Sequence, residues 1–105
     1  MQKVISAGIP KKTVTGTSSN TAQSLSDLGA TVSISDYESG KPKFAFISVE
    51  TNAVRLCLGG DATTSLGRLY QPGDGFKLEQ DEILGATIIS AVAGSHGTLQ
   101  ITTEF

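Results

Sequence analysis

The sequence predicts an all-β protein, an antiparallel β-sandwich or jelly roll of about seven to eight short strands. Three observations lead to this fold class. Apolar and polar side chains alternate in several short stretches, and turn-forming residues recur at a spacing of about ten residues. No amphipathic helical stretch separates the strands, although a helix-covered parallel sheet would need such helices.

Length and composition agree with a single small domain. The chain has 105 residues and 38% hydrophobic content, which is enough for a modest core without disulfides or metals. Gly, Ser and Thr are abundant, and Ser and Thr favour strands and turns over helix interiors. A net charge of −2 gives no strong attraction to nucleic acid or to an anionic membrane. No stretch approaches the roughly 18 apolar residues of a membrane helix, so we expect neither partner.

The first half of the chain carries the weaker strand signals. Residues 12–17 and 30–35 alternate, and residues 44–51 form a strong buried strand. Residues 16–29 are polar. They form either a long loop or an irregular edge strand near Leu25 and Leu28.

The middle of the chain begins with a clear strand at residues 53–58. Val54, Leu56 and Leu58 share one face of this strand, and the residues between them take the other. Glycines then end the strand, and residues 59–65 are expected to form a loop.

Four short elements follow in order. A short strand is expected at residues 67–71, and the Pro-Gly-Asp-Gly sequence of residues 72–75 is a dense turn signal. Residues 76–79 alternate and predict a strand. Residues 80–85 are too few for a real helix, so we expect a single helical turn or a loop.

The last two strands are expected to form a hairpin. Residues 86–93 are almost continuously apolar and rich in β-branched side chains, as in a strand that is buried on both sides. Residues 94–97 form a tight turn, and residues 98–105 alternate again.

The first 12 residues differ from the rest and are expected to form an extended or mobile arm, ahead of a single domain at 13–105. This arm contains three lysines and no acid, whereas all ten acids lie after position 26. Its apolar side chains give it something to bury on a neighbouring chain. An ordinary solvated terminus is the alternative. The candidate partner-binding residues are Lys3, Val4, Ile5, Ile9, Lys11 and Lys12.

No residue pattern predicts catalysis, a cofactor or a metal site. His96, the single histidine, sits in the predicted turn without a triad around it and is best interpreted as a solvated turn residue. Cys57 lies mid-strand without a second cysteine or a nearby histidine, which disfavours zinc. Asp81 and Glu82 are adjacent acids in a loop, and adjacent acids do not give the separation that a glycosidase needs. We therefore expect a protein that is not an enzyme.

The C-terminal half resembles small virion proteins of tailed bacteriophages, which are short β-sandwich proteins often encoded beside the capsid gene. The residues that carry this resemblance are 53–61, 62–67, 72–78, 85–89 and 97–102. The resemblance implies a structural role as a decoration or cement protein, a homotrimer on the capsid exterior that binds the major capsid protein or another virion protein. It also implies assembly in the host cytoplasm and localisation to the virion.

Other interpretations stay open. A head–tail connector or tail component would share the same small β fold. A carbohydrate- or small-ligand-binding jelly roll could use Tyr37, Tyr70 and Phe76 as an aromatic platform. A cupin-like hydrolase would need clustered histidine and carboxylate ligands, and one histidine does not supply them.

Overall fold

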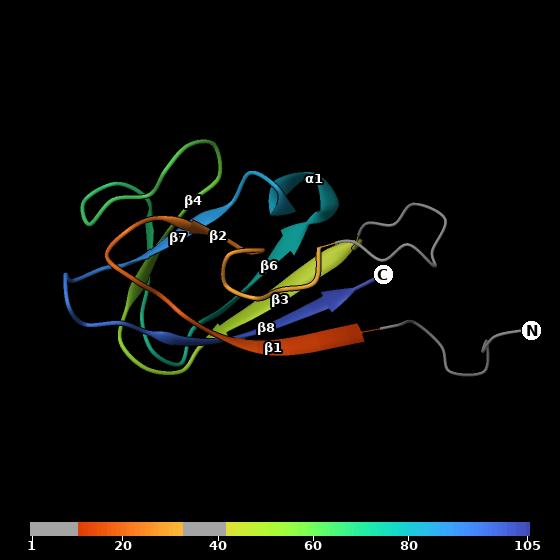
Figure 1. Ribbon diagram of the computed structural model, residues 1–105, viewed down its shortest axis with the longest axis horizontal. Coiled ribbons are helices and arrows are strands. Elements are labelled where there is room, and N and C mark those ends of the chain that lie inside the picture. The colour runs from red at the N-terminus through yellow and green to blue at the C-terminus, as the bar shows by residue number, and fades with distance from the viewer. Residues whose placement is uncertain (1–10, 33–41) are drawn as a thin grey trace, which may run out of the picture.

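The chain folds into two four-stranded antiparallel sheets with one short helix, as Figure 1 shows. The computed structural model describes residues 11–32 and 42–105. The elements are β1 (Lys11–Thr17), β2 (Gln23–Ser24), β3 (Phe44–Val49), β4 (Val54–Cys57), β5 (Arg68–Tyr70), β6 (Gly75–Glu79), α1 (Gln80–Ile83), β7 (Thr87–Ser90) and β8 (Thr98–Glu104). The expected all-β sandwich is confirmed.

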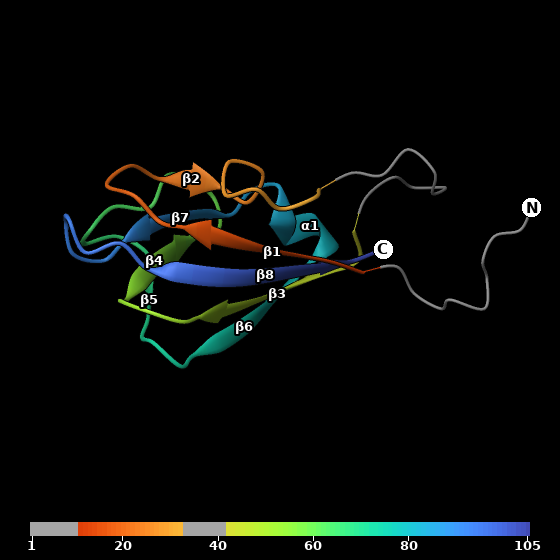
Figure 2. The same cartoon turned by 60° about the horizontal axis from the view of Figure 1, so that its bottom comes forward.

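The order of the strands is that of an eight-stranded jelly roll. One sheet, called sheet A here, has the order β1-β8-β3-β6, and the other, sheet B, has the order β2-β7-β4-β5. Figure 2 shows the strands of sheet A side by side in front of those of sheet B. Only β4 and β5 are consecutive strands within one sheet, so nearly every connection carries the chain from one sheet to the other.

Alternation along the strands places the core between the sheets. From Leu99 in β8 to Phe105 directly after it, every second residue is buried. In β3, Ala45, Ile47 and Val49 are buried by the same alternation. Side chains from sheet B pack against them, with Val54 and Ile88 completely buried. The inward face of each strand therefore follows from its apolar phase.

The loop between β4 and β5 covers part of the outer face of sheet B. Arg55 holds this loop by donating hydrogen bonds to the Thr64 and Gly67 carbonyls, each at 2.9 Å. The Thr87 hydroxyl donates to the Gly60 carbonyl at 2.8 Å and accepts from the backbone N–H of Ala62 at 3.0 Å. Because this loop lies over the sheet, β7 is buried on both of its faces, as the sequence predicts for this strand.

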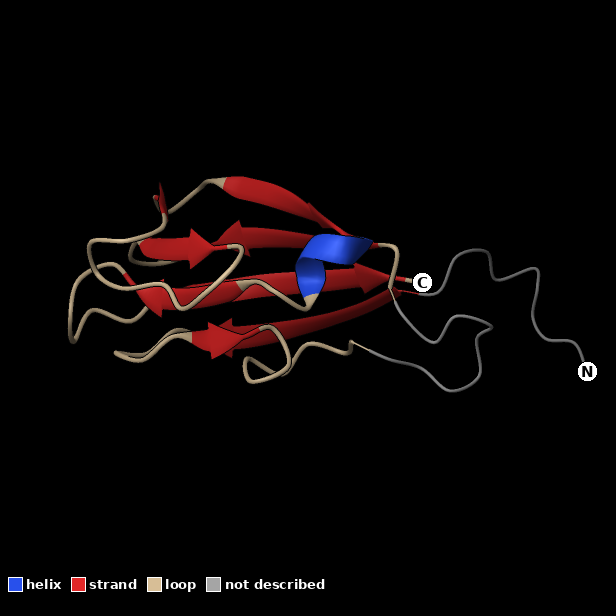
Figure 3. Ribbon diagram, turned by 90° about the horizontal axis from the view of Figure 1, so that it is seen from above, coloured by secondary structure: helices blue, strands red, loops and turns tan. Residues whose placement is uncertain are grey.

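The helix α1 is a single turn that joins β6 to β7. Figure 3 shows it at the same end of the sandwich as the C-terminus. Its start is fixed by the Glu82 carboxylate, which accepts a hydrogen bond from the backbone N–H of Glu79 at 2.8 Å. Ile83 turns inward and is buried in the core. The expected helical turn at residues 80–85 is confirmed, and Glu82 caps it.

One expectation about topology is wrong. The strands of residues 86–93 and 98–105 were expected to pair as a hairpin, but β7 belongs to sheet B and β8 to sheet A. β8 pairs with β1 on one side and with β3 on the other. The turn signal between the two strands marks a crossing from one sheet to the other. A turn shows that the chain changes direction, but it does not specify which strand the next segment pairs with.

Strand boundaries also differ from the expected ones. β7 ends at Ser90, and the turn that follows is centred on residues 93–94 between the bridge partners Val92 and Ser95. β4 ends at Cys57, and Leu58 is exposed instead of facing the core.

Three expectations concern the first half of the chain. Residues 30–32 form no strand, and the rest of the expected strand at 30–35 lies outside the described residues. The ambiguous stretch at 16–29 contains the two-residue strand β2, followed by turns that bury Leu25 and Leu28. β1 begins at Lys11, so the last two residues assigned to the arm belong to this strand.

Candidate functional site

The outer face of sheet A presents side chains of four paired strands to solvent. Its side chains form rows across the four strands because the register places outward residues opposite one another. The successive rows are Lys11–Glu104–Phe44–Glu79, Thr13–Thr102–Phe46–Lys77 and Thr15–Gln100–Ser48–Gly75. The face is thus charged at one end, aromatic in the middle and rich in hydroxyl and amide groups beyond.

A shallow hollow lies on the β3–β6 side of this face. Its volume is about 610 Å³, and its lining is mostly apolar. Phe46 contributes an exposed ring, and Gly75 leaves the space open because it has no side chain. Its lining includes Phe46, Ser48, Gly75, Lys77, Gln100 and Thr102. A hollow of this kind suits an apolar side chain of another chain more than a reaction, since Lys77 is the single ionisable side chain on it.

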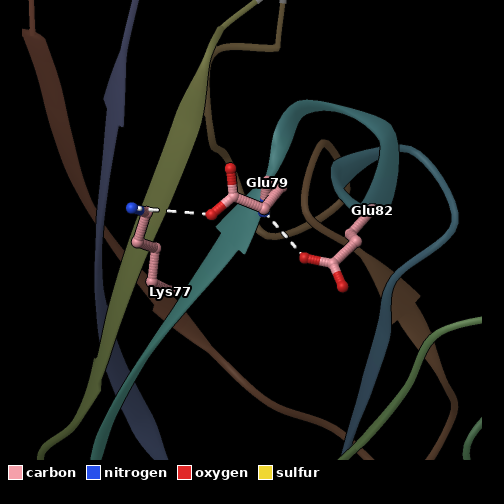
Figure 4. A network of polar contacts seen from close by, with 3 residues as sticks. All are labelled: Lys77, Glu79 and Glu82. Atoms are coloured by element: carbon pink, nitrogen blue, oxygen red, sulfur yellow. Dashed lines mark hydrogen bonds and ion pairs between the residues drawn. The ribbon is translucent and has the colours of Figure 1, made fainter.

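Lys77 organises the aromatic part of the face. Its ammonium group lies 4.0 Å from the centroid of the Phe44 ring and 5.9 Å from that of Phe46. It also pairs with the Glu79 carboxylate at 3.5 Å, and Figure 4 shows this pair beside the Glu79–Glu82 contact. Both charged side chains are about half exposed, so the ion pair adds little stability. Its main effect is to hold the ammonium over the aromatic rings.

The structure describes two of the six predicted partner-binding residues. Lys11 and Lys12 are exposed at the start of β1, opposite Glu104 and Thr103 of β8. The other four, Lys3, Val4, Ile5 and Ile9, lie outside the described residues. Lys11 stands in the same row as Phe44, so the N-terminal segment joins the fold at the charged end of sheet A.

His96 is exposed, as expected for a turn residue, and it also takes part in a polar cluster. Its Nδ1 atom lies 2.9 Å from the Ser90 hydroxyl, which lies 2.7 Å from the Ser18 hydroxyl. The Ser18 hydroxyl also accepts from the backbone N–H of Gly97 at 2.7 Å. Both serines are almost completely buried, and no Asp or Glu side chain is hydrogen-bonded to His96 in the described part of the chain. The cluster therefore fixes the connection into β8 and gives a substrate no access to a hydroxyl.

Other polar candidates lie apart from one another. Cys57 is half-buried, as expected, but it is the last residue of β4 and does not lie in mid-strand. Asp81 and Glu82 belong to α1, where Glu82 serves as the helix cap. Among residues 11–32 and 42–105, no three His, Cys, Asp or Glu side chains gather closely enough to hold a metal ion.

Two of the three residues of the predicted aromatic platform come together at the edge of the sandwich. Tyr70 and Phe76 stack with ring centroids 4.1 Å apart and an angle of 22° between their planes. Both are half-buried and pack against the core, so each ring covers a face of the other. Tyr37 lies outside the described residues.

The outward-facing aromatic side chains of sheet A were not among the predicted site residues. The sequence contains the pattern that predicts them. Phe44 and Phe46 alternate with the buried Ala45 and Ile47 along β3, so they lie on the outer face with Ser48. By contrast, the pairing of Ser18 with Ser90 has no sequence signal, since 72 residues separate the two.

No helix in the described part of the chain is long and apolar enough to span a membrane. Comparisons with protein-family models, with curated proteins and with solved structures find no match to this chain.

Proposed function

We propose that this protein is a structural component of a bacteriophage virion, a capsid decoration protein that stabilises the head by binding the major capsid protein. The resemblance to small virion proteins, which covers about residues 44–105, gives the class of protein. The observation that carries the proposal is the outer face of sheet A, which no other described segment covers and which exposes Phe46 beside an apolar hollow.

Such a face suits contact with other protein chains. Protein interfaces combine an apolar centre that contains aromatic side chains with a polar rim. Here Phe44 and Phe46 supply the centre, and Thr102 and Gln100 lie beside it on β8. The rim is uncharged towards Thr102 and Gln100, so contact on that side would not require the removal of water from ions. Around Phe44 the rim is charged, with Glu79, Lys77 and Glu104.

Symmetry adds to the strength of such contacts. A protein present in many copies on a capsid gains avidity from repeated weak contacts, and closed oligomers such as the expected trimer multiply it. The jelly roll supplies a rigid body for this purpose. Its fold alone does not select the function, because jelly rolls also occur in lectins and cupins.

The test compares particles assembled with and without this protein. We expect it to co-sediment with capsids at a fixed ratio to the major capsid protein, and capsids that lack it to release DNA at lower temperature or under milder osmotic shock. DNA release is followed by the fluorescence of an intercalating dye during heating. Capsids of equal heat and osmotic resistance with and without the protein would refute the cement role, and particles that never contain it would refute the virion role.

A further inference from the structure

The hollow on sheet A has the size and chemistry to receive aliphatic side chains. Phe46, at 40% exposure, forms its apolar wall, and the row of Ser48 ends at Gly75 without a side chain. Gln100 and Thr102 border it with groups that can hydrogen-bond a peptide backbone. An extended peptide with small branched apolar residues fits these features.

Residues 1–10 of the chain have this composition and lie outside the described structure. They contain Val4, Ile5 and Ile9, with Lys3 as the single charged side chain. Glu79 and Asp81 border the Phe44 side of the same face together with Lys43, and Glu79 already pairs with Lys77. The match between the segment and the hollow therefore lies in the apolar side chains.

The place where this segment joins the fold favours a second copy as its acceptor. Lys11 starts β1 at one edge of sheet A, while the hollow lies towards β6 at the opposite edge. Pro10 directly precedes Lys11, and a proline disfavours the helical region for the residue before it. This bias favours an extended backbone at Ile9, and ten residues can extend about 33 Å, which is enough to reach a neighbouring copy.

We propose that residues 1–10 of one copy bind the hollow on the outer face of sheet A of a second copy, with Val4 and Ile5 filling the space beside Phe46. The donor and the acceptor lie at opposite edges of one sheet, so the contact is head-to-tail. Head-to-tail contacts between identical copies can close into a ring. The expected trimer would be a ring of three copies, each of which binds the segment of its neighbour. This inference rests on the proposed function and divides the outer face of sheet A. The hollow beside Phe46 receives the second copy, and the rows towards β1 are left for the capsid.

The test uses full-length protein with separate donor and acceptor variants. The donor variant carries Val4→Asp and Ile5→Asp. The acceptor variant is Gly75→Gln, which fills the hollow. A Cβ atom at Gly75 would meet only the Ile47 carbonyl oxygen at 3.6 Å, an ordinary contact, so the fold should tolerate the change. Leu84→Ser is the matched control, because it removes a 65% exposed apolar side chain directly after α1 that does not line the hollow.

Mass in solution is measured by light scattering over a range of concentrations, with circular dichroism to verify the fold. We expect the unmodified chain and the Leu84→Ser control to form the same closed oligomer. The donor and acceptor variants should each weaken assembly at least about tenfold, towards the 10.9 kDa monomer. An equimolar mixture of the two should form a dimer of twice that mass, because one intact donor meets one intact acceptor.

Three results would overturn the proposal. These are an unmodified chain that stays monomeric at high concentration, an oligomer that both variants leave unchanged, and a mixture that stays monomeric, which would indicate docking within one copy. Capsid binding is scored separately. If the chain is monomeric and still co-sediments with capsids, this contact is rejected and the proposed function is supported. If the chain forms a closed oligomer that does not bind capsids, the contact is supported and the proposed function is rejected.

Discussion

Two threonines in neighbouring layers of the sandwich differ in how their hydroxyl groups are satisfied. Thr103 on β8 is completely buried, and its Oγ1 atom has no hydrogen-bond partner among the described residues. Thr87 on β7 both donates and accepts a hydrogen bond, to Gly60 and from Ala62. Since an unpaired buried hydroxyl costs free energy and a paired one does not, the same substitution should have opposite effects at the two positions.

We expect Thr103→Val to raise the free energy of unfolding by about 1 kcal/mol, because valine has nearly the shape of threonine without the unpaired hydroxyl. Thr87→Val should lower it by about 1–2 kcal/mol, since it leaves the Ala62 N–H without its acceptor. Urea unfolding followed by far-ultraviolet circular dichroism measures both. A loss of stability in Thr103→Val as large as that in Thr87→Val would contradict this account.

The buried pair of Ser18 and Ser90 also contributes to stability. Ser18 accepts the Gly97 N–H and contacts Ser90 inside the sandwich. Ser18→Ala should lower the free energy of unfolding by about 1–3 kcal/mol, because it leaves a buried donor unpaired. His96→Ala should cost less, since this side chain is exposed. If His96→Ala is the more damaging change in urea unfolding, then the imidazole and not the hydroxyl pair holds this turn.

Among the elements, the β4–β5 loop depends on one side chain. Arg55 projects from the outer face of β4 and donates to two carbonyls of the loop. The loop covers the outer side of β7, where Ile89 is buried although it faces away from the core. Its position thus decides whether this apolar side chain meets solvent.

Arg55→Met keeps much of the side-chain length and removes both hydrogen bonds. We expect the free energy of unfolding to fall by about 1–3 kcal/mol and the Ala62 amide to exchange at least about tenfold faster. Arg68→Met, on the exposed neighbouring strand β5, is the control. Hydrogen exchange measured by NMR reports both. Unchanged Ala62 exchange in Arg55→Met would mean that the loop is held by the Thr87 hydroxyl instead.

The sequence predicts well which segments form strands and which form turns. The apolar phase of residues 98–105 and the turn at residues 72–75 were enough to locate β8 and the β5–β6 turn. The role of Arg55 was not predictable, since its two acceptors are backbone carbonyls that any residue types would supply. Likewise, nothing local shows that Ile89 is covered from outside.

For the whole molecule, the jelly roll makes neighbours of segments that are distant in sequence. β1 pairs with β8, so Lys11 lies opposite Glu104. Period-2 patterns predict strands and their inward faces, but the partner of each strand is set by how two sheets close over a shared core. For this reason the fold class was predictable and the pairing of the last two strands was not. The hollow could not be predicted for the same reason, because it needs β3, β6 and β8 side by side.

This topology predicts a single cooperative unit. Neither sheet can form from a local hairpin series, because nearly every connection crosses to the other sheet. We expect the slowest-exchanging amides of β7 and β8 to report the same free energy of opening, equal to that of global unfolding in urea. Native-state hydrogen exchange at increasing urea tests this. Amides of sheet B that open about 2 kcal/mol below those of sheet A would show that the sheets unfold separately.

The antiparallel pairing of β1 with β8 also brings the start of the described fold and its last residue, Phe105, to one pole of the sandwich, while the Ala93–Gly94 turn projects at the other (Figure 1). A peptide fused after Phe105 would emerge beside Lys11, where the described part of the chain starts. An epitope inserted between Ala93 and Gly94 would be displayed at the far pole. For the display of a cargo on this domain, the turn is therefore a better site than the position after Phe105.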